Sequence, residues 1–199
     1  MPRRFVNPIV PKNSNDGPWK GDLCHGFFDV MYHAGRIPIP EGARLLEVGS
    51  AEADFVTPLK ALRPDLHITI MDQRTHKVRP GADVSVIGNV LDSILFPEGT
   101  FDVVIACSVI EHVGIGRYND PIHPDGDSVA MANIHRWLQP DGVFYLDVPY
   151  RPSGDSTPFR QYNEKDLQRR VIKGWTEIDR EYFNPPHPDG PYVALVLKP

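Results

Sequence analysis

The chain has 199 residues, a formal net charge of -5 and 41% hydrophobic residues, and its charges form no long block of one sign. This length suits a single domain, and the charge disfavours a protein whose main ligand is nucleic acid, because affinity for phosphates depends on clustered Lys and Arg. No apolar run approaches the roughly 20 residues that a bilayer-spanning helix needs, so no membrane segment is expected.

The two cysteines, Cys24 and Cys107, lie far apart in the sequence and in apolar surroundings. No cleavable leader is recognisable after Met1, which disfavours export to an oxidising compartment. We therefore expect a soluble, cytoplasmic protein with two reduced thiols and no disulfide.

Apolar periodicity predicts alternating strands and helices after an extended N-terminal arm over residues 1–19, which is rich in Pro, Asn and basic residues. The remaining residues, 20–199, form one domain. The expected helices cover residues 20–36, 52–62, 128–138 and 163–173, and the expected strands cover residues 44–48, 67–71, 83–87, 101–107, 143–148, 175–183 and 192–197. The predicted fold class is α/β, with a doubly wound, mostly parallel sheet, helices on both faces and an antiparallel C-terminal hairpin.

Three local details sharpen this prediction. Leu62 is placed on the buried face of its helix, and Asp127 is placed at the N-cap of the helix that follows it. The segment Pro140-Asp141-Gly142 is expected to be the turn that leads out of that helix into the next strand.

The stretch from Arg44 to Asp54 is a short apolar strand followed by small residues and a helix start. Open α/β sheets use this geometry to bring backbone N–H groups against a ligand, so a nucleotide site is predicted here. In Gly49-Ser50-Ala51-Glu52-Ala53 only the first residue is glycine. A nicotinamide-dependent oxidoreductase is therefore a weaker alternative, because its fingerprint needs three glycines.

Three later segments bring polar groups to the ends of predicted strands. Asp72 closes the second strand, roughly 20 residues after the glycine turn. The third strand is followed by Gly88-Asn89-Val90-Leu91-Asp92. The fourth, Phe101–Cys107, runs into Ser108-Val109-Ile110-Glu111-His112-Val113. Because the carboxyl ends of parallel strands meet at one edge, these segments are expected to share one site.

With these four segments in this order, the chain after about residue 20 resembles the class I, seven-stranded and Rossmann-like S-adenosylmethionine-dependent methyltransferases. The segment from Phe101 to Val113 is the most specific match, and the loop from Gly116 to Asp127 resembles a little-characterised bacterial branch of methyltransferase-like proteins. The resemblance implies a seven-stranded sheet and S-adenosylmethionine as cofactor. It also implies methyl transfer to a hydroxyl or amine of a small molecule, such as a sugar or a secondary metabolite.

The resemblance also implies the cofactor contacts, with the Asp72 carboxylate on the ribose hydroxyls and Asn89 against the adenine. The implied cofactor-binding residues are Glu47, Gly49, Ser50, Ala51, Asp72, Asn89, Val90 and Cys107. Two glycines of the family's turn are alanine here, at Ala51 and Ala53, and a methyl group limits backbone approach and positive φ. Either the turn is built differently or cofactor binding is weaker.

The loop after the fourth strand, residues 111–127, holds two His, three Asp and one Arg between glycines and prolines. Alignment of the acceptor can supply most of the acceleration of methyl transfer, and a general base helps when the acceptor is a hydroxyl. His112 is the first candidate for this base because imidazole titrates near neutral pH. Its alternative role is packing at a helix start. His123 and Asp120 are the other catalytic candidates, as a His–carboxylate pair.

Candidate substrate contacts are Arg117, Tyr118, Tyr150 and Arg151, since an Arg fork can hold a carboxylate or phosphate on the acceptor. A solvated Arg is the alternative. The spacing of His and Asp in the loop matches no metal-site template, so no metal is predicted. The arm, this loop and the segment 150–162 are expected to cover the acceptor together. The expected partner is a small-molecule acceptor without nucleic acid or membrane, and a homodimer is left open. A non-catalytic binding or assembly protein is the alternative function.

Overall fold

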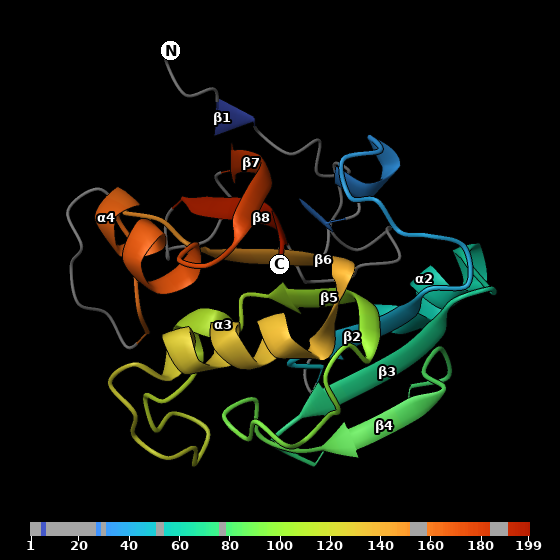
Figure 1. Ribbon diagram of the computed structural model, residues 1–199, viewed down its shortest axis with the longest axis horizontal. Coiled ribbons are helices and arrows are strands. Elements are labelled where there is room, and N and C mark those ends of the chain that lie inside the picture. Colours follow the sequence, from blue (N-terminus) through green and yellow to red (C-terminus); the bar gives the residue numbers. More distant parts are fainter. Residues whose placement is uncertain are drawn as a thin grey trace.

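The computed structural model describes residues 5–6, 27–28, 31–50, 54–75, 79–151, 159–183 and 191–199. In this part of the chain one sheet lies between two layers of helical segments (Figure 1). The predictions for Cys24, Ala51 and Ala53 fall outside the described residues, as does most of the arm.

The sheet has the strand order β1-β7-β8-β6-β5-β2-β3-β4. The strands are β1 (Phe5–Val6), β2 (Arg44–Val48), β3 (His67–Asp72), β4 (Val84–Ile87), β5 (Phe101–Cys107), β6 (Leu138–Pro149), β7 (Thr176–Phe183) and β8 (Tyr192–Lys198). The strands β2 to β6 pair in parallel, and β8 is antiparallel to both of its neighbours. The predicted mostly parallel sheet with an antiparallel C-terminal hairpin is confirmed. β1 adds a two-residue strand parallel to β7, which the sequence did not predict.

The central strands are apolar on both faces because each face carries its own core. Leu46 and Val48 of β2 pack in the core that contains α3 (Gly126–Trp137). Leu45, which points to the opposite face, packs in the core that contains α2 (Val56–Leu62) and the helical residues 27–28 and 31–33. Alternate side chains of a strand point to opposite faces, so this two-sided burial requires the near-continuous apolar runs found in the sequence.

The predicted helix 163–173 is present as two short pieces, α4 (Glu164–Asp166) and the π-helix η2 (Leu167–Val171). Asn163 caps it, because its Oδ1 accepts a hydrogen bond from the N–H of Asp166 at 2.9 Å. Gly174 ends it with a φ of +86°, a conformation that favours glycine. A single turn of 3-10 helix, η1 (Ile110–His112), follows β5.

Three local predictions were wrong. Leu62 is 56% exposed, because the buried face of α2 ends at Leu59. Asp127 does not cap α3, because this helix begins at Gly126 and Asp127 lies inside it. The Asp127 carboxylate is bound by the Arg170 side chain instead. Residues 140–142 lie within β6, which begins at Leu138 because Leu138 pairs with Phe101 before the register shifts.

Candidate functional site

The turn after β2 has the conformation that a ligand-binding glycine turn needs. Gly49 has a φ of +85°, and its N–H donates to the carbonyl of Met71 at the end of β3 at 2.8 Å. A Cβ on Gly49 would lie 2.4 Å from Cγ2 of Val109. Both the backbone conformation and the space therefore require glycine, and the chain after β5 packs directly over this turn.

The residues beside this turn are buried. Ser50 is fully buried, and within the described part of the chain its hydroxyl has no hydrogen-bond partner. Glu47 is buried in β2 and Cys107, a free thiol, is buried in β5. Val90 packs in the core with α3, and its carbonyl accepts from the side-chain amide of Asn133 at 2.8 Å. The Ser50 hydroxyl is thus a buried polar group beside the turn that could form a hydrogen bond with a ligand.

Asp72, the predicted ribose-binding residue, lies at the end of β3 with its carboxylate already held. It accepts from the N–H of Arg74 at 2.8 Å, from Nε at 3.1 Å and from Nη2 at 3.2 Å. The same guanidinium lies over the ring of Tyr118, 4.2 Å from the centroid. The sequence missed Arg74, although its position two residues after the acid was a signal for this local pairing.

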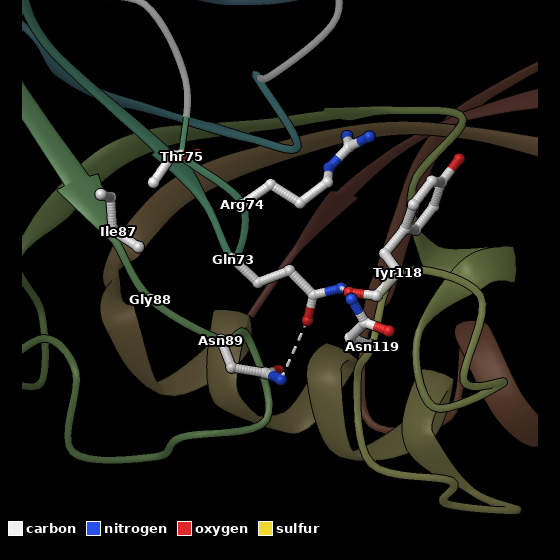
Figure 2. Close-up of a pocket in the computed structure, with 8 residues that line it drawn as sticks. All are labelled: Gln73, Arg74, Thr75, Ile87, Gly88, Asn89, Tyr118 and Asn119. Carbon is white, nitrogen blue, oxygen red and sulfur yellow. Dashed lines mark hydrogen bonds between the residues drawn. The ribbon is translucent and has the colours of Figure 1, made fainter.

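A cavity of about 450 Å³ opens beside these residues, where β3 and β4 end (Figure 2). It is lined by Gln73, Arg74, Thr75, Ile87, Gly88, Asn89, Tyr118 and Asn119. Figure 2 shows Gln73 reaching between Asn89 and the loop that carries Tyr118. The Gln73 amide accepts from Asn89 at 3.1 Å and donates to the carbonyl of Tyr118 at 3.3 Å. The loop after β5 is therefore tied to the wall of the cavity.

Asp120 holds this loop in shape. It is buried, and its carboxylate accepts from the N–H of Gly114 at 2.5 Å and from that of Tyr118 at 3.4 Å. His123 is exposed, and its Nδ1 accepts from the N–H of Asp125 at 3.2 Å. The expected His123–Asp120 pair does not form between these two described side chains, because Asp120 points into the loop.

His112 lies in η1 with 16% of its side chain exposed. Its ring makes edge contacts with Tyr118 and Phe159, at centroid distances of 5.8 and 5.5 Å. Nε2 lies 3.8 Å from Oε1 of the buried Glu111, and Nδ1 lies 3.5 Å from Nη1 of Arg117. The imidazole therefore has the Glu111 carboxylate near Nε2 and the Arg117 guanidinium near Nδ1.

Ser108, which the sequence did not single out, follows β5 and contacts Asp147 of β6 and, with its hydroxyl 3.4 Å from that of Tyr192, β8. It has a φ of +52°, which is rare for a residue other than glycine. Its N–H donates to Oδ1 of the buried Asp147 at 2.9 Å, and its hydroxyl donates to Oε1 of Glu111 at 2.5 Å. These bonds hold the strained residue and fix where η1 begins.

A group of ionic contacts joins the loop to the segment 159–172. The buried carboxylate of Asp127 accepts from Nε and Nη2 of Arg170 at 2.7 and 2.6 Å, and from the Tyr162 hydroxyl at 3.0 Å. Burial, followed by the charge of Asp127, raises the pKa of Tyr162 well above its ordinary value. Arg160 donates from its backbone to the carbonyl of Glu111 and from its side chain to that of His123. The predicted proximity of the loop and the segment 150–162 is confirmed for the described residues.

The remaining candidates follow β6. Tyr150 is buried, and its ring packs on Tyr182 with centroids 4.9 Å apart. The N–H of Arg151 donates to the carbonyl of Tyr162 at 2.9 Å, so residues 160–162 extend the carboxyl edge of β6.

Among the described residues, no group of three or more His, Cys, Asp or Glu is placed to hold a metal ion. None of the helices described here has the length and apolarity needed to cross a bilayer.

A family model described as "Caenorhabditis protein of unknown function, DUF268" matches residues 89–166, which is less than half of the chain. No curated protein sequence matches.

Several solved structures are similar over most of the chain. One is a Burkholderia thailandensis 1,6-didemethyltoxoflavin-N1-methyltransferase with bound 1,6-didemethyltoxoflavin and S-adenosylhomocysteine (TM-score 0.65, 20% identity, covering 89% of this chain and 79% of that one). A second is the N-methyltransferase NodS from Bradyrhizobium japonicum in complex with S-adenosylhomocysteine (TM-score 0.62, 13% identity, 96% and 92%). A third is the [4+2]-cyclase SpnF (TM-score 0.67, 17% identity, 94% and 84%). The chain therefore has the fold of the class I S-adenosylmethionine-dependent methyltransferases.

Proposed function

We propose that the chain binds S-adenosylmethionine and transfers its methyl group to a hydroxyl or amine of a small molecule in the cytoplasm. The observation that supports this most strongly is that Gly49, Asp72 and His112 share the carboxyl edge of a sheet with the methyltransferase fold. The net charge of -5 favours a small-molecule acceptor over nucleic acid.

The described residues fit this cofactor in three respects. The cavity of about 450 Å³ is within the range of pockets that bind ligands of this size. The Ser50 hydroxyl is buried and unsatisfied within the described residues, and Gly49, which adds no side chain of its own, has the positive φ of a glycine turn. Asp72 would hold the ribose hydroxyls, Asn89 and Gln73 the adenine end, and Gly49 and Ser50 the amino-acid end.

The bound cofactor supplies an electrophilic methyl group, and the residues of this chain align the acceptor and hold its proton. His112 takes that proton at Nδ1 once the Arg117 guanidinium, whose Nη1 lies 3.5 Å from this nitrogen, has turned toward the acceptor. The Glu111 carboxylate, 3.8 Å from Nε2, stabilises the imidazolium that forms. The aromatic rings of Tyr118 and Phe159 pack against the imidazole and fix its orientation.

Calorimetry with S-adenosylhomocysteine tests cofactor binding. We expect wild-type protein to bind and Asp72→Asn to bind at least about tenfold more weakly, since a charge-assisted contact contributes about 1.5–3 kcal/mol. Asp102→Asn is the matched control, because Asp102 bonds Arg44 at the opposite, amino edge of β2 and β5. No binding by the wild type, or equal binding by Asp72→Asn, would refute the proposal.

Methyl transfer itself is tested by measuring the transfer of a labelled methyl group to a panel of small hydroxyl and amine acceptors. We expect His112→Gln to lower turnover for hydroxyl acceptors by about 10²–10⁴-fold while leaving S-adenosylhomocysteine binding unchanged.

The alternative is a non-catalytic binding or assembly protein. It is favoured by the contact of Arg74 with Asp72 and by the packing of Val109 against Gly49, both of which cover groups that the cofactor would use. Turnover that is abolished by His112→Ala with intact cofactor binding would exclude this alternative.

A further inference from the structure

The charged residues of the loop after β5 divide into two groups. The carboxylates are all engaged by neighbours: Glu111 by Ser108, Asp120 by the backbone of Gly114 and Tyr118, Asp125 by Arg170, and Asp127 by Arg170, Arg160 and Tyr162. Asp125 and Asp127 are thus paired with arginines, whereas Glu111 and Asp120 are held by neutral hydrogen-bond donors and keep their negative charge.

Arg117 is the exception. Within the described part of the chain its guanidinium has no carboxylate within 4.0 Å, and its side-chain contacts are Nδ1 of His112 at 3.5 Å and the ring of Tyr118 at 5.3 Å. Arg151, in the chain segment that follows β6, likewise has no side-chain hydrogen bond or ion pair among the described residues.

The backbone around Arg117 is fixed. Gly116 and Asn119 have φ of +76° and +62°, which form the turn, and Asp120 ties the N–H of Tyr118. A Cβ on Gly116 would lie 3.2 Å from the side chain of Ile122, and the positive φ itself favours glycine here. Arg117 is therefore held next to His112 by a built turn and not by a loose surface loop.

The second guanidinium comes from the other segment that borders His112. Phe159 contacts the imidazole, and three residues later Tyr162 accepts the hydrogen bond from the N–H of Arg151. Two aromatic rings thus pack against His112, those of Tyr118 and Phe159. The chain near each ring also carries an arginine that has no carboxylate partner among the described residues: Arg117 near Tyr118 and Arg151 near Phe159 in the sequence.

From this arrangement we infer that the acceptor carries an anionic group, a carboxylate or a phosphate, that Arg117 binds beside Nδ1 of His112, with Arg151 as a second donor. This inference rests on the proposed function. Arginine is suited to it, because its planar fork binds two oxygens of such a group at once. The bound anion places the rest of the acceptor next to Tyr118, which lines the cavity, with its nucleophile near the base.

The test is a titration of the full chain with sodium benzoate and, separately, with inorganic phosphate, followed by NMR of the His112 ring nitrogens. Each titration is run with and without S-adenosylhomocysteine. We expect a saturable shift with at least one anion, weakened at least tenfold in Arg117→Gln and partly restored in Arg117→Lys. Arg169→Gln is the matched control, because Arg169 is an exposed arginine on η2 that pairs with Asp166.

The two arms identify the anion: a benzoate response alone indicates a carboxylate, and a phosphate response alone indicates a phosphate ester. No shift with either anion, or the same affinity in Arg117→Gln, overturns the inference. If S-adenosylhomocysteine binds and neither anion does, the inference fails while the proposed function stands. If an anion binds through Arg117 and S-adenosylhomocysteine does not bind, the anion site stands and the methyl-transfer assignment fails.

Discussion

The Arg74 guanidinium spans both carboxylate oxygens of Asp72, with Nε 3.1 Å from Oδ1 and Nη2 3.2 Å from Oδ2. A ribose diol would need the same two oxygens, so Arg74 must move before the diol binds. Because a partly exposed ion pair contributes about 0.2–1 kcal/mol, we expect Arg74→Gln to bind S-adenosylhomocysteine about two- to fivefold more tightly in calorimetry. Equal or weaker binding would show that Arg74 assists the cofactor and does not compete with it.

The second prediction concerns Gly49. Gly49→Ala should destabilise the fold by the cost of a positive φ, about 1–2 kcal/mol, plus about 1–3 kcal/mol of overlap with Val109. Gly174→Ala is the matched control, since Gly174 has nearly the same φ, +86°, and a Cβ there meets nothing within 4 Å. Urea denaturation should give a lower free energy of unfolding for Gly49→Ala than for Gly174→Ala. In the double variant with Val109→Ala, only the stability lost through overlap with Val109 should return. A double variant as unstable as Gly49→Ala would contradict this account.

The third prediction concerns Asp127. Asp127→Asn leaves the arginines Arg170 and Arg160, each with about 15% of its side chain exposed, without their shared carboxylate. Removing one partner of a buried pair costs about 3–5 kcal/mol, and we expect a loss of this size in chemical denaturation. Asp166→Asn, which removes the partner of the exposed Arg169, should cost less than about 1 kcal/mol. Similar losses in the two variants would mean that the Asp127 contacts are not buried in solution.

The fourth prediction is a pH dependence at Asp179. Hydrogen bonds from Arg36 hold the pKa of Asp179 below its ordinary value. The stability that this pair supplies is therefore complete above the unfolded-state pKa of about 3.9 and is lost as the pH falls through the lower, folded-state pKa. The difference in unfolding free energy between wild type and Asp179→Asn should be constant from pH 7 to 5 and should shrink below pH 4. A difference that grows on acidification would contradict the lowered pKa.

The sequence predicted those parts of the fold that depend on local pattern. β2 and β5 begin and end where apolar periodicity placed them, because strands buried on both faces must be apolar throughout. The polar residues at strand ends, such as Asp72 and Asn89, were predicted to share an edge because parallel pairing requires it. The roles of these residues toward a cofactor stay predictions.

The parts that were missed depend on partners distant in the sequence. Asp127 was assigned to a helix cap because its own neighbours allow it, whereas its actual partner Arg170 is 43 residues away. The pairing of β1 with β7 joins the two ends of the chain and leaves no local pattern. The strained φ of Ser108 accompanies its bond to Asp147, which is 39 residues away in β6 and is brought near only when β5 and β6 pair.

Tyr118 is contacted by two guanidinium groups, that of Arg74 at 4.2 Å and that of Arg117 at 5.3 Å. One phenol ring therefore connects the carboxylate at the end of β3 with the imidazole in η1. A ligand that draws Arg74 away from Asp72 must alter the packing of this ring, and the ring in turn sets the place of Arg117 beside His112. Occupancy of the two halves of the site should accordingly be cooperative, and by thermodynamic linkage each ligand must change the affinity of the other by the same factor.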